Sequence, residues 1–413
     1  MKSCAIMMIC CLVAFGTNVA SARTPTSDSL RHFKLVREAH STDLLDVALL
    51  CGSYVVKNLP PRTADTTRTD IGKLHTSILP GVGYSIQTGF SAVLQSNCGF
   101  YMADGADANL SAVEASFNYT QLHQILIPLQ GNLWTADNRY NLQTDWRFLQ
   151  FPQLTYGLGG YSSISNAYTF DFTNVRLYTT LYRALVPDIF IGIGANIDLL
   201  WNVHEVNPPT GEVTDFQRYG VSSNSVSSAP SLNFLYDTRR NSINPSGGNF
   251  VNVVYRPCLT AFGSTTNWQS LIVDLRKFIP LPVGTGNVLA FWSYDWLTPS
   301  GAPPYPLLPN LGGDPYGNTG WGFNEGRFRG PDMVYAECEY RFHITRNRLF
   351  GGVVFANTES IAQTNGQFAR ISAGYGAGIR VKFNKYSKTN VAIDYGFGTD
   401  GSKGVFINLG EVF

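Results

Sequence analysis

The sequence predicts an all-β protein, a transmembrane antiparallel β-barrel of about 16 strands. Only 14% of its residues are charged, whereas 13% are aromatic and 40 of 413 are Gly; an average soluble chain is about 25% charged. From about residue 76 onward, apolar residues alternate with small or polar ones at the period of a β-strand. The connections between these segments alternate between short and long, which is typical of barrels in an outer membrane.

Composition excludes two other classes of protein. The 30 Lys and Arg residues nearly balance the 29 Asp and Glu residues, so the net charge is +1 and no basic surplus marks a nucleic-acid-binding surface. The mean hydropathy is only -0.04. A bundle of membrane-spanning helices is therefore excluded, because each needs about 20 consecutive apolar residues.

The N-terminus predicts export from the cytoplasm. Lys2 is followed by an apolar stretch over residues 5–15 and then by Ala20-Ser21-Ala22, a pattern that a signal peptidase cleaves. We therefore expect a signal peptide over residues 1–22. The alternative, a lipid-modified start at Cys10 or Cys11, is less favoured because Met7-Met8-Ile9 lacks the small residues that such processing requires.

Residues 23–75 are expected to form a periplasmic N-terminal segment that is too small to be a folded domain. Its only apolar stretch, residues 43–50, predicts a short amphipathic helix capped by Ser41 or Thr42 and stopped by Gly52. Three alternatives stay open: the helix lies in the lumen, it lies at the membrane edge, or it is part of a simple tether.

Residues 76–413 predict the barrel itself. In residues 371–383 one face carries Ile, Ala, Tyr, Val and Phe, and the other carries Ser, Gly, Arg and Lys. A soluble sandwich also alternates, but its polar face would raise the charged fraction, so we expect the apolar face to contact lipid and the polar face to line a lumen. The predicted strands are 77–85, 90–102, 111–120, 125–136, 140–151, 169–183, 189–201, 226–238, 248–259, 270–279, 287–298, 333–345, 349–359, 371–384, 390–399 and 403–413.

Three segments of the chain carry motifs. Residues 236–248 read Tyr-Asp-Thr-Arg-Arg-Asn-Ser-Ile-Asn-Pro-Ser-Gly-Gly, which could be an elaborate turn. The longest connection contains Leu-Gly-Gly at residues 311–313 and Gly-Phe-Asn-Glu-Gly-Arg-Phe-Arg-Gly at residues 322–330. The end of the chain carries residues 374–380, 393–396 and 409–413. Together these segments resemble the barrel of the bacterial surface antigen family, the BamA/TamA family, from about residue 230 to the C-terminus.

The resemblance implies an external loop that folds into the lumen, and a barrel without the family's periplasmic POTRA domains. The residues that match the family's loop motif, or stand within it, are Trp321, Gly322, Phe323, Glu325, Gly326, Arg327 and Arg329. The family places Arg and Asp where this chain has Trp321 and Asn357. Replacing both members of the ion pair costs less folding free energy than replacing one, because a single replacement leaves a buried charge without a partner. We therefore expect Arg327 and Arg329 to hold the loop against Glu337 and Glu339.

The polar faces of the last strands predict a lumenal ion network made of Glu337, Glu339, Arg341, His343, Arg380 and Asp394. A catalytic carboxylate pair is disfavoured because cations share the same face. Gly374, Gly376 and Gly378 are expected to leave room for a loop against the wall.

We expect no enzyme activity, no cofactor and no metal site. Cys51, Cys98, Cys258 and Cys338 match no metal spacing, although one disulfide stays open.

The last residues resemble the C-terminal signal that the barrel-assembly machinery reads, with Leu409 and Phe413 as its apolar positions. Phe413 is expected at the lipid interface, as an aromatic-girdle residue, as that signal, or as both.

By resemblance, the chain is predicted to reside in the bacterial outer membrane and to insert or translocate proteins, as an accessory or divergent member of the family. Expected partners are outer-membrane lipid, the barrel-assembly machinery during biogenesis, and client or periplasmic proteins; nucleic acid is not expected. The alternative is a structural or porin-like barrel that moves no protein.

Overall fold

The computed structural model describes residues 41–44, 46–47, 74–85, 88–103, 109–239, 241–282, 286–364, 366–368, 370–385 and 388–413. The predicted signal peptide, Cys51 and most of the predicted N-terminal segment lie outside these residues.

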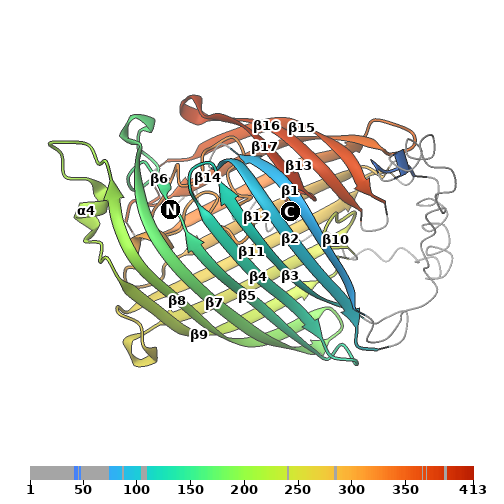
Figure 1. The fold of residues 1–413 in the computed structure, drawn as a ribbon, viewed down its shortest axis with the longest axis horizontal. Helices are drawn as coiled ribbons and strands as arrows, with labels where there is room; N and C mark the ends of the chain where they lie inside the picture. The colour runs from blue at the N-terminus through green and yellow to red at the C-terminus, as the bar shows by residue number, and fades with distance from the viewer. Residues whose placement is uncertain are drawn as a thin grey trace.

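The described residues form one antiparallel sheet that curls into a barrel (Figure 1). Every strand pairs with its neighbours, and β1 also pairs with β17, so the sheet returns to its start. The strands are β1 (His75–Ser85), β2 (Gly89–Tyr101), β3 (Leu110–Thr120), β4 (Ile125–Trp134), β5 (Tyr140–Gln150), β6 (Gln153–Thr155), β7 (Tyr168–Val186), β8 (Ile189–Val206), β9 (Ser225–Asp237), β10 (Gly248–Cys258), β11 (Trp268–Pro280), β12 (Val288–Leu297), β13 (Met333–His343), β14 (Phe350–Ile361), β15 (Ser372–Asn384), β16 (Thr389–Gly398) and β17 (Lys403–Leu409).

The number of strands around the barrel agrees with the prediction. The sheet has 17 strands, but the short β6 pairs with β7 just beyond β5, which pairs with the same strand. Since β6 continues the line of β5, the ring has 17 − 1 = 16 positions. An even number of antiparallel positions places the start of β1 and the end of β17 at the same end of the barrel.

The two faces of the sheet differ as the alternation predicts. Along β15 the odd-numbered residues from Ala373 to Ile379 are exposed, whereas Ser372, Gly374 and Arg380 are buried. Large apolar side chains lie exposed on the outward face of many strands, among them Phe117, Ile191, Ile193, Leu232, Val354, Ile379, Ile393 and Ile407. A soluble monomer rarely exposes so much contiguous apolar surface, so this face fits contact with hydrocarbon.

The connections differ in length at the two ends of the barrel. One end has short turns such as residues 187–188 and 344–349, and we call it the short-turn end. The other end carries long loops, residues 156–167, 207–224 and 298–332, with a short helix α4 (Asp215–Tyr219) and 3-10 turns η1 (Ile164–Asn166), η2 (Thr260–Phe262), η3 (Tyr305–Leu307) and η4 (Thr399–Gly401). Within the described part of the chain, no helix has the length and apolar character needed to span a membrane.

The predicted N-terminal helix is described only at its start, where its cap differs from the expectation. The Asp43 carboxylate accepts a hydrogen bond of 2.8 Å from the Asp46 amide, and the Asp46 carboxylate accepts one of 3.2 Å from the Asp43 amide. Asp43, rather than Ser41 or Thr42, is therefore the cap, because this reciprocal pair satisfies two amides at once. Lys385, in the turn after β15, donates to Asp43 through its amide and to Asp46 through its ammonium group. The helix thus lies against the short-turn end.

Candidate functional site

The loop of residues 298–332, which we call the inward loop, fills much of the barrel interior. Its side chains Tyr305, Leu311 and Phe323 are buried, and its residues Asn310 and Arg329 pair in an isolated β-bridge that gives the loop its own backbone order. On the far wall, Arg147 of β5 donates a 2.8 Å hydrogen bond to the carbonyl of Pro315. The loop therefore crosses the lumen, as the family resemblance implies.

Glycines on the inner face let the loop touch the wall directly. A Cβ atom on Gly374 would lie 2.8 Å from the carbonyl oxygen of Trp321, and one on Gly396 would lie 2.7 Å from the amide nitrogen of Gly322. Gly374 thus leaves room for the loop as expected. Gly376 and Gly378 do not contact the loop in this way, because a Cβ there would meet the Phe355 ring or the Asp394 carboxylate.

The positions of the family's Arg and Asp still meet, although the ion pair is absent. The Asn357 side-chain amide donates a 2.9 Å hydrogen bond to the carbonyl of Trp321. The buried Trp321 ring lies 4.7 Å from the Phe406 ring and 6.1 Å, edge-on, from the Phe355 ring. Aromatic packing and one hydrogen bond from a side chain to the main chain therefore join the loop to β14 and β17.

Arg327 and Arg329 do not pair with Glu337 and Glu339, so this prediction was wrong. Arg327 donates to the Ser162 hydroxyl at 3.0 Å and to Asp400 at 3.3 Å. Arg329 donates to the side-chain oxygen of Gln153 at 2.5 Å and to the carbonyl of Tyr305 at 3.0 Å. Arg329 therefore meets β6, and Arg327 meets Ser162 in the loop after β6 and Asp400 in η4. The sequence spacing could not reveal these contacts, because the partners are far away along the chain.

Glu325 and Gly326 of the inward loop also contact β6. The Glu325 carboxylate accepts a 2.6 Å hydrogen bond from Gln153, and burial raises the pKa of this carboxyl group to about 7. A Cβ on Gly326 would lie 2.7 Å from the carbonyl oxygen of Leu154, so glycine allows β6 to approach.

Asp400, which meets Arg327, has a pKa below its usual range because Arg370 donates a hydrogen bond to it.

The predicted lumenal ion network is present in part. Arg341 pairs with Glu339 at 2.6 Å, and Arg380 pairs with Asp394 at 2.6 Å. Glu337 instead accepts a hydrogen bond from the Tyr335 hydroxyl. His343 lies at the short-turn end, where its amide donates to Asn287.

The residue that joins the two ion pairs is Glu411, which the sequence analysis missed. Its carboxylate lies 2.8 Å from Arg380 and 3.9 Å from Arg341, and it accepts a 2.5 Å hydrogen bond from Asn390. Burial alone would raise the pKa of Glu411, but the two guanidinium groups outweigh it and hold the pKa below the usual range. Glu411 therefore anchors the end of the chain as a carboxylate.

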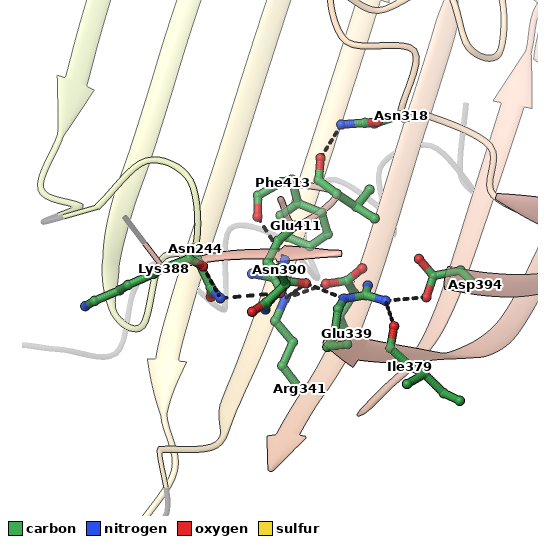
Figure 2. Close-up of polar contacts among 12 residues, drawn as sticks. Asn244, Asn318, Glu339, Arg341, Ile379, Lys388, Asn390, Asp394, Glu411 and Phe413 are labelled. Carbon is green, nitrogen blue, oxygen red and sulfur yellow. Dashed lines mark hydrogen bonds and ion pairs between the residues drawn. The ribbon is translucent and has the colours of Figure 1, made fainter. Parts of the chain in front are cut away.

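The last four residues, which we call the C-terminal tail (410–413), turn into the lumen (Figure 2). Strand β17 ends at Leu409, and Gly410 has φ +106°, a left-handed conformation that favours glycine. The Phe413 ring lies 5.1 Å from the Trp292 ring of β12 and 6.0 Å from the Phe278 ring of β11, on strands several positions away from β17 around the ring. The expected place of Phe413 at the lipid interface is therefore wrong for this structure.

Polar contacts from three other segments hold the tail. Arg341 donates a 2.9 Å hydrogen bond to the Phe413 carbonyl oxygen, and Asn318 of the inward loop donates a 2.5 Å one to the Val412 carbonyl (Figure 2). Asn244, in the turn after β9, donates to Glu411 at 3.4 Å. The three motif segments of the sequence, residues 236–248, the inward loop and the C-terminus, thus meet at the tail.

Among the strands that the structure describes, β1 and β17 share the fewest backbone pairs, and we call this junction the seam. These strands share one pair, Ser85 with Phe406, whereas β1 shares eleven pairs with β2 and β17 shares seven with β16. The inward turn at Gly410 takes residues 410–413 away from the line that would continue along β1. Residues 407–409 still pair with β16 but have no partner among the described residues of β1. Leu409 still pairs with Val391 of β16 through the backbone.

The described residues hold no group of three or more His, Cys, Asp or Glu side chains that could bind a metal. Beside the tail lies a cavity of about 210 Å³ at the short-turn end, lined by Arg341, Arg380, Lys382 and Glu411 among others. Cys98, Cys258 and Cys338 are free thiols.

Comparisons with known proteins agree on the fold. No protein-family model and no curated protein sequence matches the chain. Among solved structures, BamA from Haemophilus ducreyi lacking POTRA domains 1-3 is similar with a TM-score of 0.54 and 14% identity, over 81% of this chain and 70% of that one. CdiB from Acinetobacter baumannii gives 0.54 and 12% over 83% of this chain and 60% of that one, and CdiB from Escherichia coli gives 0.51 and 10% over 83% and 68%. At such identities the likeness shows a shared barrel fold.

Proposed function

We propose that this chain is an outer-membrane barrel of the protein insertion or translocation class, a divergent relative of BamA and TamA that acts through its β1–β17 seam. The observation that carries the proposal is the single backbone pair across the seam. Over the described residues of β1 and β17, the edges facing the seam share one pair, whereas a ladder of several pairs closes the other junctions.

An open seam has a clear physical consequence in a membrane. Unpaired backbone N–H and C=O groups cost several kcal/mol each in hydrocarbon, and an exposed strand edge is a template for another strand. A client strand that pairs with β1 would satisfy these groups. The apolar outward face fits the same location, because exposed residues such as Ile193 and Leu232 would contact lipid.

The proposed partners follow from this role. They are outer-membrane lipid around the barrel, a client or periplasmic protein at the seam, and the barrel-assembly machinery during the chain's own biogenesis, when Leu409 and Phe413 would be read before the tail docks. No catalytic group, cofactor or nucleic acid takes part in the proposed function.

The second candidate is a structural or porin-like barrel. One observation favours it: Trp321 and Asn357 stand where the family has the Arg and Asp of its ion pair. The filled lumen opposes it, because the inward loop and the C-terminal tail contact each other across the interior through Asn318 and Val412.

Folding of a client separates the two candidates. We expect liposomes that contain the barrel to speed the folding of an unfolded outer-membrane client relative to empty liposomes. A disulfide between Val82→Cys and Leu409→Cys, in a chain without other cysteines, should lock the seam and abolish the gain, and reduction should restore it. The matched control is the same chain without the pair.

Steady solute flux through the unmodified barrel, with client folding no faster than in empty liposomes, would support the porin-like role and refute the insertion proposal.

A further inference from the structure

The cavity of about 210 Å³ at the short-turn end carries a surplus of cationic side chains. Among the described residues that line it, one, Glu411, is acidic, whereas six are Arg or Lys: Arg341, Arg348, Arg380, Lys382, Lys385 and Lys388. These cations come from β13, from β15 and from the two turns at residues 344–349 and 385–388. A concave site with cations on several sides attracts an anion more strongly than a flat surface does.

The acidic groups of the protein do not use all the donors on the wall of this cavity (Figure 2). Arg341 pairs with Glu339. Arg380 pairs with both Asp394 and Glu411. Nη1 of Arg341 and Nη2 of Arg380 are nevertheless buried without a hydrogen-bond partner, in side chains of residues that are only 7% and 4% exposed. A buried donor without an acceptor is costly, so a further acceptor beside these two guanidinium groups is favoured.

Two of the cations occupy strained backbone positions. Arg348 and Lys388 have φ of +59° and +64°, the left-handed conformation that favours glycine. Of the eight described residues other than glycine with a positive φ, the remaining six are Asn, Asp or His, which adopt this conformation more readily. Glycine would fit both turn positions without strain, so folding alone does not explain why charged side chains stand there.

The Arg348 side chain folds back against the cavity wall. A Cβ on Gly286, in the turn before β12, would lie 2.9 Å from Nε2 of His343 and 3.3 Å from Nη2 of Arg348. All three residues line the cavity. The guanidinium group of Arg348 is therefore held beside the cavity, although the residue itself belongs to a turn.

The chain's own N-terminal segment shows that this end of the barrel binds oxyanions. Lys385 binds the carboxylates of Asp43 and Asp46 through its amide and its ammonium group. These two aspartates are not among the residues that line the cavity; of the described N-terminal residues, Ser41 lines it. The interior of the cavity is therefore left to a separate, small anion.

We propose that this cavity binds a phosphate group, carried by an anionic lipid headgroup or by a soluble phosphate ester. A phosphate presents oxygens in several directions, so guanidinium and ammonium groups from two strands and two turns can contact it together. A carboxylate presents only two oxygens in one plane and suits a single arginine. The ends of membrane-spanning strands lie at the level of the lipid headgroups, so both sources are within reach. The site goes beyond the proposed insertion role and does not depend on it.

The experiment titrates the full-length barrel, in a neutral detergent at constant ionic strength, with inorganic phosphate and with glycerol phosphate. We expect saturable heat of binding in isothermal titration calorimetry for both, and none for chloride or glycerol. The double variant Arg348→Gly with Lys388→Gly should bind at least about tenfold more weakly, because it loses charge-assisted hydrogen bonds. Glycine relieves the backbone strain at both positions, so this variant should still fold, which thermal unfolding checks.

Two further variants sharpen the titration. Lys382→Gln on β15 leaves both turns intact and should also weaken binding. Arg139→Gly removes an exposed cation from the turn at residues 135–139, at the same end of the barrel but outside the cavity. It is the matched control and should leave the affinity unchanged.

Lipid nanodiscs distinguish the two sources of the phosphate group. Retention of phosphatidylglycerol over phosphatidylcholine in native mass spectrometry, lost in the double glycine variant, would assign the site to a lipid headgroup. Binding of glycerol phosphate without this lipid preference would assign it to a soluble ester.

Three results would overturn the proposal: no phosphate binding by the folded barrel in either arm, equal affinity of the unmodified chain and the double glycine variant, or tighter binding of an Asp-rich peptide than of either phosphate. Neither measurement uses client folding. A barrel that binds phosphate but does not speed client folding would keep this site and lose the insertion role, so the two failures are distinguishable.

Discussion

Neutralising Glu411 should release the C-terminal tail and let the seam close. Glu411→Gln keeps the shape of the side chain but removes its charge, which now meets Arg380 at 2.8 Å and Asn390 at 2.5 Å. The Glu411 side chain is 2% exposed, so solvent does not screen these contacts. A hydrogen bond involving a charged group contributes about 1.5–3 kcal/mol and a neutral one about 0.5–1.5 kcal/mol.

The loss is therefore about 1–1.5 kcal/mol for each of the two short bonds, or about 2–3 kcal/mol in total. This corresponds to a shift of roughly 30- to 150-fold in the equilibrium between docked and released tail. The docked tail keeps its contacts of Phe413 with Trp292 and of Val412 with Asn318, so the substitution raises the released population by this factor and leaves the barrel itself folded.

The assay is disulfide formation between Val82→Cys and Leu409→Cys in a chain without other cysteines. The seam register places these positions opposite each other only when β17 extends along β1. Crosslinking should be slow with Glu411 and much faster with Glu411→Gln, while Glu212→Gln, at an exposed loop position, should have no effect. Asn318→Ala should give a smaller increase, because it removes one hydrogen bond to Val412.

Equal crosslinking rates in the chain that keeps Glu411 and in the Glu411→Gln variant, with both folded, would refute the reasoning that this carboxylate holds the seam open.

Four further predictions concern the inward loop, the pH and the two faces of the barrel. Trp321→Arg and Asn357→Asp should each destabilise the barrel by about 3–5 kcal/mol through an unpaired buried charge. In the double variant the two charges can pair, so its loss of stability should be about 1–3 kcal/mol smaller than the sum of the two single losses. Thermal unfolding in detergent measures these losses, and strict additivity would contradict the prediction. Because the pKa of Glu411 is lowered in the folded chain, its stabilisation is present above its unfolded pKa of about 4.3 and is lost as the pH falls through the lowered value. The released tail should therefore become more populated in acid, which the distance between spin labels at residues 82 and 409 measures without requiring a thiolate. The pKa of Glu325 is raised to about 7, so docking of the inward loop should be strongest at low pH and weaken as the pH rises from about 4.5 toward 7; single-channel noise should follow this change and lose it in Glu325→Gln. Phe117→Arg, on the outward face of β3, should lower folding stability by about 2–4 kcal/mol near mid-bilayer, whereas Glu114→Arg on the inward face should cost far less; equal losses in a vesicle-folding titration would mean that the faces are assigned wrongly.

The sequence by itself determined the barrel and its two faces. A side-chain period of two places every second residue on the same face, so Ile379 and Arg380 could be assigned to opposite faces without coordinates, and the structure agrees. The 16 positions and the contrast between short and long connections were also predicted, because turn residues and apolar runs are local features. The meeting of Glu339 with Arg341 is local as well, since residues i and i+2 share a face.

Only the tertiary structure decided where the loop arginines and the chain end lie. Arg327 finds Ser162 and Asp400, which are far away in sequence, and no local pattern shows that these side chains meet. Continuing the alternation of β17 predicted Phe413 on the outward face, but that pattern ends at Gly410, whose positive φ turns the chain inward. Contacts with Trp292, Arg341 and Arg380 stabilise this turn. These residues lie on other strands, so the contacts form only once the barrel has closed and has brought those strands around the same lumen.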